Sequence, residues 1–221
     1  MNIAIIVFAG KGTRIGTEIP KQFIKINGKD LVSYTINAFN SHPFIDEIVL
    51  VTSKEYLPYV KTFKHTYHFD KVSQVVEGGE TRQESVRKAL IKINGSNSDF
   101  VFIHDGDRPL ISDDLITKCI KEVHEGKNIV PLMNKNDRVQ GISNSGRVIE
   151  LNNEVFDVQT PQCFPYNLIK EAHLTFKDEA VSDDASLIEK LGKQITYVKG
   201  EQNNFKVTHP TDLDYLEKLV K

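Results

Sequence analysis

The 221-residue sequence has very few cysteines, no long hydrophobic run and almost no net charge. Its two cysteines, Cys119 and Cys163, match neither a disulfide framework nor a metal-binding motif, and they fit a reducing, cytoplasmic location. The apolar start at residues 1–10 is too short to span a membrane and lacks the basic region of a signal peptide. A formal net charge of −2 argues against a general nucleic-acid or membrane surface. Any anion site must therefore come from a local cluster of cations.

The sequence also lacks internal repeats, low-complexity tracts and a clear interdomain linker. We therefore expect one domain over residues 1–221. Short apolar runs alternate with segments whose apolar residues are spaced three and four apart, as in amphipathic helices. This alternation predicts an α/β fold with a Rossmann-like, mainly parallel sheet covered by helices on both faces. The expected strands are 3–9, 47–53, 72–78, 100–105, 127–133 and 194–200, and the expected helices are 29–40, 53–67, 81–93 and 112–126.

One polar, β-rich stretch at 134–162 breaks this alternation, and the sequence Asn144-Ser145-Gly146 within it suits a hairpin turn. A two-stranded hairpin is only marginally stable alone, so this segment should pack against something. A second copy of the chain is the favoured partner, which predicts a homodimer held through residues 134–158. The alternative is a surface excursion on a monomer.

The loop after the first expected strand, Phe8-Ala9-Gly10-Lys11-Gly12-Thr13-Arg14, is a candidate phosphate site. Ligands of parallel α/β sheets bind beyond the carboxyl ends of the strands, and glycines there let backbone N–H groups approach phosphate oxygens. The loop lacks the Walker A order and the last spacing of a dinucleotide fingerprint, which disfavours an NAD-dependent dehydrogenase. Arg14 and Lys21 would add cations that stabilise charge in polyphosphate transfer. A simple turn with solvated cations is the alternative.

Two further strand ends carry residues suited to a nucleotide site. In 77–86, the small Gly79 and the polar Glu80 and Ser85 could read the edge of a base. In 102–110, Asp105 follows a buried strand, where a carboxylate suits Mg²⁺, a cation that takes oxygen ligands and bridges phosphates. The alternative for Asp105 is a turn cap that pairs with Arg108.

Two stretches near the end of the chain complete the candidate site. Ser182 in 181–189 is expected to cap a helix whose first turn is acidic. Lys206 in 203–213 lies in a strand-like segment before Pro210 and a terminal helix. Either feature alone would be read as ordinary capping or as a surface lysine.

Five motifs that occur in one order are far more specific than any one of them. They are "AGKGTRIG…PKQF", "GGETRQESV", "HDGDRPL", "QTPQCF…SDDASLIE" and "NNFKVTHPTDL". Together they resemble the cytidylyltransferase family that makes CDP-alcohols, whose members act on 2-C-methyl-D-erythritol 4-phosphate or ribitol 5-phosphate. The resemblance runs from residue 3 to about residue 216. It implies a nucleotidyltransferase sheet, a protruding β-arm that clasps a dimer mate, CTP as nucleotide and Mg²⁺ as cofactor.

The resemblance also implies roles for individual residues. Arg14, Lys21 and Lys206 would be catalytic cations, the two lysines flanking the α-phosphate of CTP. Losing Lys21 is expected to reduce kcat by ~10²–10³, as for one strong transition-state donor. Nucleotide contacts would come from Ala9, Gly10, Gly12, Thr13, Gly79, Glu80, Ser85 and Asp105, with Asp105 near the metal, and second-substrate contacts from Arg108 and Ser182. Lys135 and Arg138 are further candidates for second-substrate contacts, where this chain departs from the family pattern.

The identity of the alcohol phosphate depends on details of the motifs. In this resemblance, the methylerythritol branch has Asp-Thr at the positions where this chain has Asn134-Lys135. That branch also has an arginine where this chain has Asn152. Lys135 or Arg138 would have to replace that charge. Because "VFAG" and "HDG" are closer to the ribitol branch, we expect a polyol phosphate, preferably ribitol 5-phosphate, for teichoic acid or capsule synthesis. Methylerythritol phosphate, for isoprenoid synthesis, is the main alternative, and a related substrate such as glycerol or mannitol phosphate is a further one.

Asp107 departs from both branches of the family, and it would bind polyol hydroxyls or pair with Arg108. A non-enzymatic nucleotide-binding regulator is a further alternative for the whole chain. Such a protein should have lost a catalytic cation, yet Arg14, Lys21 and Lys206 are all present.

Overall fold

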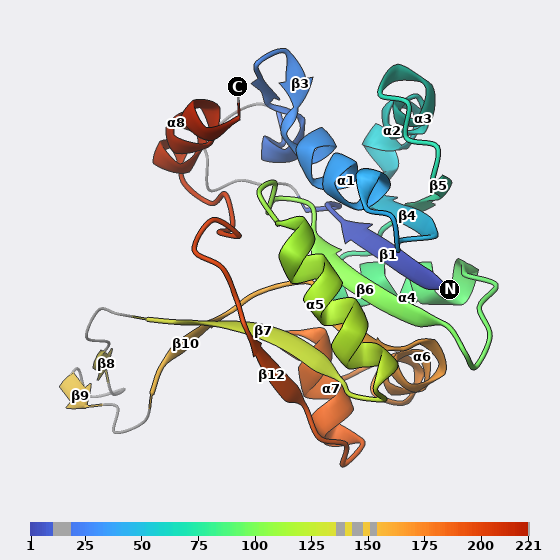
Figure 1. Ribbon diagram of the computed structural model, residues 1–221, viewed down its shortest axis with the longest axis vertical. Helices are drawn as coiled ribbons and strands as arrows, with labels where there is room; N and C mark the ends of the chain where they lie inside the picture. Colours follow the sequence, from blue (N-terminus) through green and yellow to red (C-terminus); the bar gives the residue numbers. More distant parts are fainter. Residues whose placement is uncertain (11–18, 136–139, 143–147, 151–153, 221) are drawn as a thin grey trace.

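The computed structural model describes residues 1–10, 19–135, 140–142, 148–150 and 154–220 (Figure 1). Its strands are β1 (Asn2–Val7), β2 (Lys25–Ile26), β3 (Lys29–Asp30), β4 (Glu47–Thr52), β5 (Val72–Glu77), β6 (Phe100–Asp105), β7 (Ile129–Asn134), β8 (Gln140–Ile142), β9 (Val148–Glu150), β10 (Phe156–Val158), β11 (Gln162–Pro165) and β12 (Thr196–Lys199). Its α-helices are α1 (Leu31–Ser41), α2 (Leu57–Lys61), α3 (Phe63–Thr66), α4 (Arg82–Lys92), α5 (Asp113–His124), α6 (Tyr166–Thr175), α7 (Asp184–Lys190) and α8 (Pro210–Leu219), and short 3-10 helices are η2 (Lys21–Phe23) and η3 (Lys54–Tyr56).

The central sheet has the strand order β10-β7-β11-β6-β1-β4-β5, with β12 beside β7. Neighbouring strands from β5 to β6 are parallel, which confirms the predicted mainly parallel sheet. In this sheet β10 and β11 run antiparallel to their neighbours. Val7 at the end of β1 pairs with Val51 of β4 and Asp105 of β6. The carboxyl ends of these strands therefore meet at one edge of the sheet.

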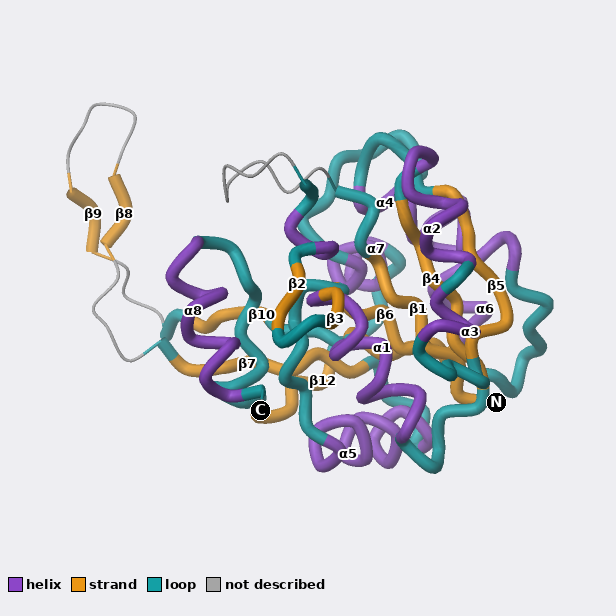
Figure 2. The backbone as a smooth tube through the Cα atoms, turned by 90° about the horizontal axis from the view of Figure 1, so that it is seen from above, coloured by secondary structure: helices purple, strands orange, loops and turns teal. Residues whose placement is uncertain are grey.

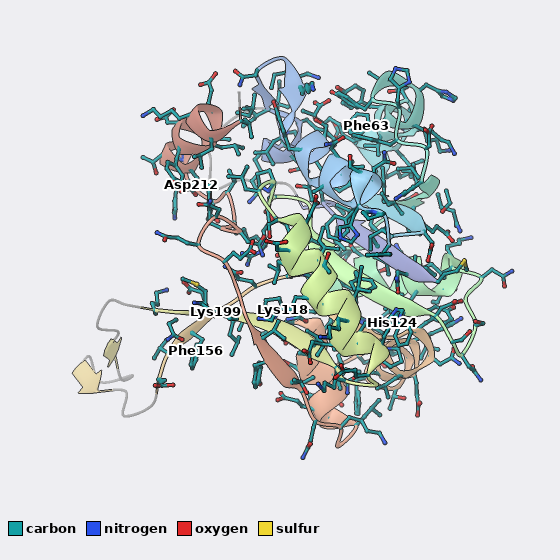
Figure 3. All side chains as sticks on the ribbon, viewed as in Figure 1. Phe63, Lys118, His124, Phe156, Lys199 and Asp212 are labelled. Carbon is teal, nitrogen blue, oxygen red and sulfur yellow. The ribbon has the colours of Figure 1, made fainter. Side chains whose placement is uncertain are left out.

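Helices cover both faces of the sheet, because alternate residues of each inner strand point to opposite sides. In β1, Ala4 and Ile6 join a core with α1, α3 and α5, whereas Ile3 and Ile5 join a core with α4, α6 and α7. Phe63 of α3, labelled in Figure 3, is fully buried in the first core. Burying one such apolar side chain contributes about 1.5–3 kcal/mol. The continuous apolar runs of the sequence are thus explained by burial on two sides.

The helix expected over 53–67 is instead divided into η3, α2 and α3. Pro58 lies in the first turn of α2, where a missing N–H costs nothing, so it starts a new helix rather than continuing one. Ser112 caps α5 through its hydroxyl, which accepts from the Leu115 amide at 3.0 Å. The expected cap at Ser182 is wrong by one residue. Asp183 caps α7, because its carboxylate accepts from the Ser186 amide at 3.0 Å, whereas Ser182 is exposed.

The described parts of the segment 134–158 contain paired strands, as its polar, β-rich sequence predicts. Phe156 of β10 lies opposite Asn134 of β7, and β8 pairs antiparallel with β9 in a separate small sheet. Figure 2 shows that β8 and β9 extend away from the main body. The predicted turn at 144–146 lies outside the described residues, and the role of this arm in dimerisation stays a prediction.

The C-terminal segment returns to the N-terminal half of the chain. Val207 and Leu216 pack with Ile26 and Leu31 in a third small core, which places α8 near β2 and β3 (Figure 1). Val207 also donates its amide hydrogen to the Asp107 carbonyl at 2.9 Å. Lys206 is thereby held at the carboxyl end of β6. Among the described residues, no helix is long and apolar enough to cross a membrane.

Candidate active site

A cavity of about 290 Å³ opens at the edge where β1 and β6 end. It brings together two groups of the residues predicted to bind nucleotide, one from the first loop and one from the turn before α4. The full lining consists of Val7, Phe8, Ala9, Gly10, Lys21, Gln22, Gly79, Glu80, Thr81, Arg82, Ser85, Asp105, Asp107 and Lys206. The predicted residues Gly12, Thr13 and Arg14 lie outside the described part of the chain.

Gln22 holds the start of the first loop in place. Its side-chain amide donates to the carbonyl oxygens of Phe8 at 2.9 Å and of Gly10 at 2.8 Å. The Gln22 side chain is buried, so these two bonds take the place of hydrogen bonds that its amide would otherwise form with water. Gln22 belongs to the motif "PKQF", but the sequence indicates no role for it. Only the three-dimensional structure shows that it bonds to Phe8 and Gly10.

The turn before α4 approaches the first loop closely. A Cβ atom on Gly78 would lie 2.5 Å from the Ala9 Cβ, so a larger residue would displace one wall of the cavity. The Ser85 hydroxyl accepts from the Gly79 amide at 3.0 Å and donates to the Thr81 carbonyl at 2.9 Å. The predicted base-reading residues therefore lie in the cavity wall, and in this structure Ser85 shapes the turn.

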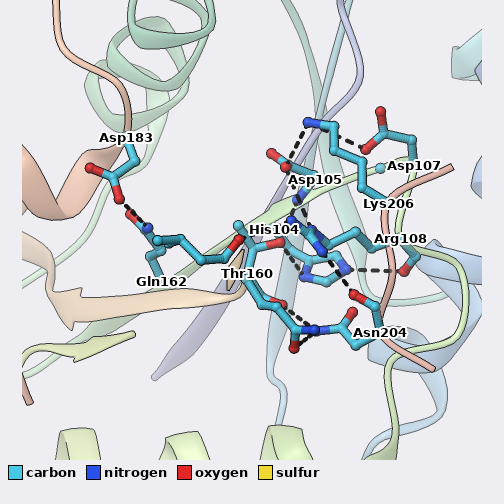
Figure 4. A network of polar contacts seen from close by, with 12 residues as sticks. His104, Asp105, Asp107, Arg108, Thr160, Gln162, Asp183, Asn204 and Lys206 are labelled. Carbon is cyan, nitrogen blue, oxygen red and sulfur yellow. Dashed lines mark hydrogen bonds and ion pairs between the residues drawn. The ribbon is translucent and has the colours of Figure 1, made fainter. Parts of the chain in front are cut away.

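Asp105 is the centre of a network of charged side chains (Figure 4). Its Oδ1 accepts from Arg82 Nε at 3.0 Å and its Oδ2 from Lys206 Nζ at 2.9 Å, while Arg108 Nε lies 3.7 Å from Oδ2. Burial alone would raise the pKa of Asp105, but the charges of Arg82, Lys206 and Arg108 outweigh burial and hold the pKa well below its usual range. Asp105 is therefore a carboxylate at neutral pH.

Arg82 links this network to the helices behind the sheet. Its NH1 donates to Asp184 Oδ2 at 2.7 Å, and Asp184 Oδ1 lies 3.0 Å from His173 Nε2. Burial opposes ionisation of Asp184, yet Arg82 and His173 lower its pKa. Sequence analysis assigned no role to Arg82, Asp184 or His173. Arg82 lies inside "GGETRQESV" and Asp184 inside "SDDASLIE", but nothing in either motif indicates that the two residues meet.

Lys21 and Lys206 come together, as the resemblance implies, and Asp107 lies between them. Lys21 Nζ is 2.6 Å from Asp107 Oδ2 and donates to the Val207 carbonyl at 2.6 Å. Lys206 Nζ is 3.7 Å from Asp107 Oδ1. The expected pairing of Asp107 with Arg108 is therefore replaced by pairing with the two lysines, because the loop after β6 turns Asp107 toward η2 and the C-terminal segment.

Arg108 is buried and bonded to backbone oxygens. Its NH1 donates to the Asn204 carbonyl at 2.8 Å and its NH2 to the Val158 carbonyl at 3.1 Å. Nearby, His104 lies between the Arg108 carbonyl and the Thr160 hydroxyl (Figure 4). Burial lowers the pKa of His104 to about 3, so this histidine is neutral at physiological pH. Arg108 thus ties the loop after β6 to β10 and to the C-terminal segment.

Two further cavities adjoin the first one and contain the described residues predicted to bind the second substrate. One, of about 460 Å³, is lined partly by Arg108, Lys135 and Lys206, and Lys135 Nζ there is 2.9 Å from Asp157. The other, of about 260 Å³, includes Arg108, Ser182 and Lys206. Lys206 lines all three cavities, so it marks where they meet. Arg138 lies outside the described residues.

The residues present suit a divalent cation that phosphate oxygens help to hold. No group of three or more His, Cys, Asp or Glu side chains within the described residues forms a complete metal site. Mg²⁺ is commonly bound by one or two carboxylates, with substrate phosphates and water completing its coordination. Asp105 is ionised and lines the cavity, so it is the carboxylate that would hold such an ion.

Comparisons with known proteins agree with this geometry. The family model described as "IspD: 2-C-methyl-D-erythritol 4-phosphate cytidylyltransferase" matches residues 2–221. The 2-C-methyl-D-erythritol 4-phosphate cytidylyltransferase of Clostridium novyi is 41% identical over 225 residues, covering 100% of this chain and 96% of that protein. The enzyme of that name from Clostridium tetani is 42% identical, covering 100% and 90%.

Solved structures with related names share the fold. The 4-diphosphocytidyl-2C-methyl-D-erythritol synthase of Anaerococcus prevotii superposes with a TM-score of 0.86 at 26% identity, covering 99% of this chain and 95% of that one. The Francisella tularensis 2-C-methyl-D-erythritol 4-phosphate cytidylyltransferase gives 0.82 at 27% identity, covering 99% of both chains. These findings favour the methylerythritol branch, and they do not support the preference for ribitol 5-phosphate drawn from "VFAG" and "HDG".

That preference depended on a few short motifs, whereas the match extends over nearly every residue of the fold. The chain therefore belongs to the 2-C-methyl-D-erythritol 4-phosphate cytidylyltransferase (IspD) family and is a CTP-dependent nucleotidyltransferase.

Proposed function

We propose that this protein transfers CMP from CTP to 2-C-methyl-D-erythritol 4-phosphate, forming the CDP-alcohol and pyrophosphate for isoprenoid synthesis. The observation that carries the proposal is the family match over residues 2–221. The geometry supports it, because a cavity lined by the nucleotide-binding candidates meets two cavities lined by the second-substrate candidates at Lys206. A transfer between two bound phosphates requires such a junction.

The proposed chemistry needs positioning and charge neutralisation more than proton transfer. The alcohol phosphate is already ionised at neutral pH, so its oxygen attacks the α-phosphorus of CTP in line and pyrophosphate leaves without a general base. Two anions must approach each other, which is unfavourable in water. Lys21 and Lys206 would stabilise the charge that develops on the phosphoryl oxygens. Asp105 would hold a Mg²⁺ ion together with the phosphates, and the bound ion would supply further neutralisation.

We propose that residues at the base of the arm select the second substrate. Asn134 and Lys135 line the larger second cavity together with Arg108. In the resemblance described under sequence analysis, these two positions depart from the Asp-Thr of the methylerythritol branch. We propose that Lys135 supplies a positive charge for the substrate phosphate, because it lines the same cavity as Arg108 and Lys206.

The proposal is tested by pyrophosphate release with CTP and Mg²⁺. Methylerythritol 4-phosphate, ribitol 5-phosphate, glycerol phosphate and mannitol phosphate are compared side by side at equal concentrations. We expect methylerythritol 4-phosphate to have the highest kcat/KM, by at least about tenfold. A higher kcat/KM for ribitol 5-phosphate would reject the proposed substrate while leaving the cytidylyltransferase class intact.

A further inference from the structure

We infer that Asp107 is an internal anion that competes with the phosphates of the nucleotide for Lys21 and Lys206, and thereby makes the site discriminate against metal-free CTP. The inference rests on the proposed function, in which these two lysines bind the nucleotide phosphates. It adds a specificity role for a residue that departs from the motif of the family.

The geometry places the two carboxylate oxygens of Asp107 against different lysines. Oδ2 is 2.6 Å from Lys21 Nζ, and Oδ1 is 3.7 Å from Lys206 Nζ. The Asp107 carbonyl also accepts from the Val207 amide at 2.9 Å, which fixes the backbone at this place. Asp107 lines the same cavity as Ala9 and Gly10. A phosphate that reaches both lysines must therefore replace the Asp107 carboxylate or approach it closely.

Asp107 is not needed as the sole support of Lys21. The Lys21 ammonium has a second acceptor, the Val207 carbonyl at 2.6 Å, and only 9% of the lysine side chain is exposed. This burial and the second bond hold the ammonium near its place when the carboxylate is exchanged for another anion. Competition, rather than positioning, is therefore the main consequence of placing a carboxylate here.

The Asp107 carboxylate has fewer cationic partners than Asp105, two lysines instead of three cations. Asp105 lies within 4 Å of Arg82, Lys206 and Arg108, and both its oxygens accept hydrogen bonds. Asp107 Oδ1 is buried without a hydrogen-bond partner among the described residues. The Asp107 side chain is only 13% exposed, so little water screens its charge, and Oδ1 has only the 3.7 Å ion pair with Lys206 to balance it. That charge repels an incoming polyphosphate.

The repulsion depends on the charge of the ligand. Metal-free CTP carries about four negative charges at neutral pH, whereas its magnesium complex carries about two. A fixed negative charge in the wall therefore disfavours the metal-free form about twice as strongly in free energy. Uncharged cytidine, which has no phosphates, should not sense Asp107.

The test measures dissociation constants by titration calorimetry for Asp107→Asn, which removes the charge and keeps the shape. The ligands are metal-free CTP in the presence of a chelator, Mg·CTP, and cytidine. The matched control is Asp178→Asn, the same exchange at a side chain that is 87% exposed and lines none of the three cavities. We expect Asp107→Asn to bind metal-free CTP ~10-fold and Mg·CTP ~3-fold more tightly, with cytidine unchanged. Asp107→Glu, which restores the charge, should recover the wild-type ratio.

Equal or weaker binding of both forms of CTP by Asp107→Asn would overturn the inference and leave Asp107 as a support for Lys21. If Asp107→Asn does not fold, Lys21→Met is compared with the double variant Lys21→Met/Asp107→Asn, which lacks both partners of the buried contact. The inference is also overturned if the ratio of the dissociation constants for metal-free CTP and Mg·CTP is the same in these two variants.

Lys206→Met separates this inference from the proposed function. If it binds CTP as tightly as wild type, the proposed phosphate site is wrong, whatever Asp107 does.

Discussion

The cationic side chains near Asp105 differ in how many protein groups they bond to and in how exposed they are. Arg108 donates to two backbone carbonyls, and Arg82 joins two carboxylates. Lys21 is buried and shared between Asp107 and a carbonyl. The Lys206 side chain is 34% exposed, and both of its ion-pair partners are carboxylates in the cavity wall. Lys206 is therefore best placed to move onto a substrate phosphate.

We accordingly expect Lys206→Met to lower kcat by ~10²-fold, because a cation at the developing charge is lost while the aliphatic stem is retained. Steady-state pyrophosphate release measures the effect. Lys199→Met is the control, since Lys199 is an exposed lysine on β12 that lines none of the three cavities (Figure 3). A kcat within about threefold of wild type would show that Lys206 does not act in the reaction.

His104 should make the fold sensitive to mild acid. Burial lowers its pKa to about 3 in the folded state, against an ordinary value of 6.5. Between these values the unfolded chain binds a proton that the folded chain does not. The free energy of unfolding therefore falls as the pH decreases below 6.5, by up to about 1.4 kcal/mol per pH unit from this group.

Urea unfolding at several pH values above 4.5 tests this expectation, because the lowered pKa of Asp105 costs stability only near and below its ordinary value of 3.8. His104→Asn should reduce the slope against pH, whereas His65→Asn, at an exposed histidine, should leave it unchanged. Parallel pH curves for wild type and His104→Asn would contradict the assignment.

At the scale of elements, the polar network around Asp184 joins three helices, α4, α6 and α7. Asp184 opens α7, contacts Arg82 of α4 and approaches His173 of α6. These helices also bury apolar residues in the core behind the sheet. The packing of that core consequently determines where Arg82 lies relative to Asp105.

Replacing Asp184 by Asn should destabilise the protein by about 2–4 kcal/mol, because Arg82 and His173 lose a buried charged partner. Chemical denaturation measures the change in the free energy of unfolding. Asp178→Asn, on the exposed segment after α6, should change it by less than about 0.5 kcal/mol. A loss below about 1 kcal/mol for Asp184→Asn would show that water or a rearranged partner compensates Arg82.

At the scale of the whole molecule, the arm at 134–158 carries the predicted contact with a second copy of the chain. The Lys135 amide donates to the Val155 carbonyl at 3.1 Å, so the two sides of the arm are already paired at its base. This pairing allows residues 136–153 to be replaced by a Gly-Gly turn without disturbing β7 and β10.

We expect the wild-type chain to be a dimer through the arm and the shortened variant to be a monomer of nearly unchanged melting temperature. Sedimentation velocity over a range of concentrations distinguishes the two states. A monomeric wild type would show that the dimer prediction is wrong. A dimeric variant would place the interface elsewhere.

The sequence by itself determined the architecture, because apolar periodicity reports burial and burial on both faces requires a covered parallel sheet. It also identified the enzyme class, since several motifs had to occur in one order. Its choice between alcohol phosphates was not supported, because "VFAG" and "HDG" are short motifs, whereas the family match extends over residues 2–221.

Only the tertiary structure decided which charges meet. Arg82 and Asp184 are far apart in the chain, and the partner of Asp107 is Lys21 rather than the adjacent Arg108. Sequence patterns report the burial of each residue along its own element, whereas ion pairs depend on the orientation of different elements at the edge of the sheet. Packing of α8 against β2 and β3 brings Lys206 to Asp105, and no local pattern encodes that long-range contact.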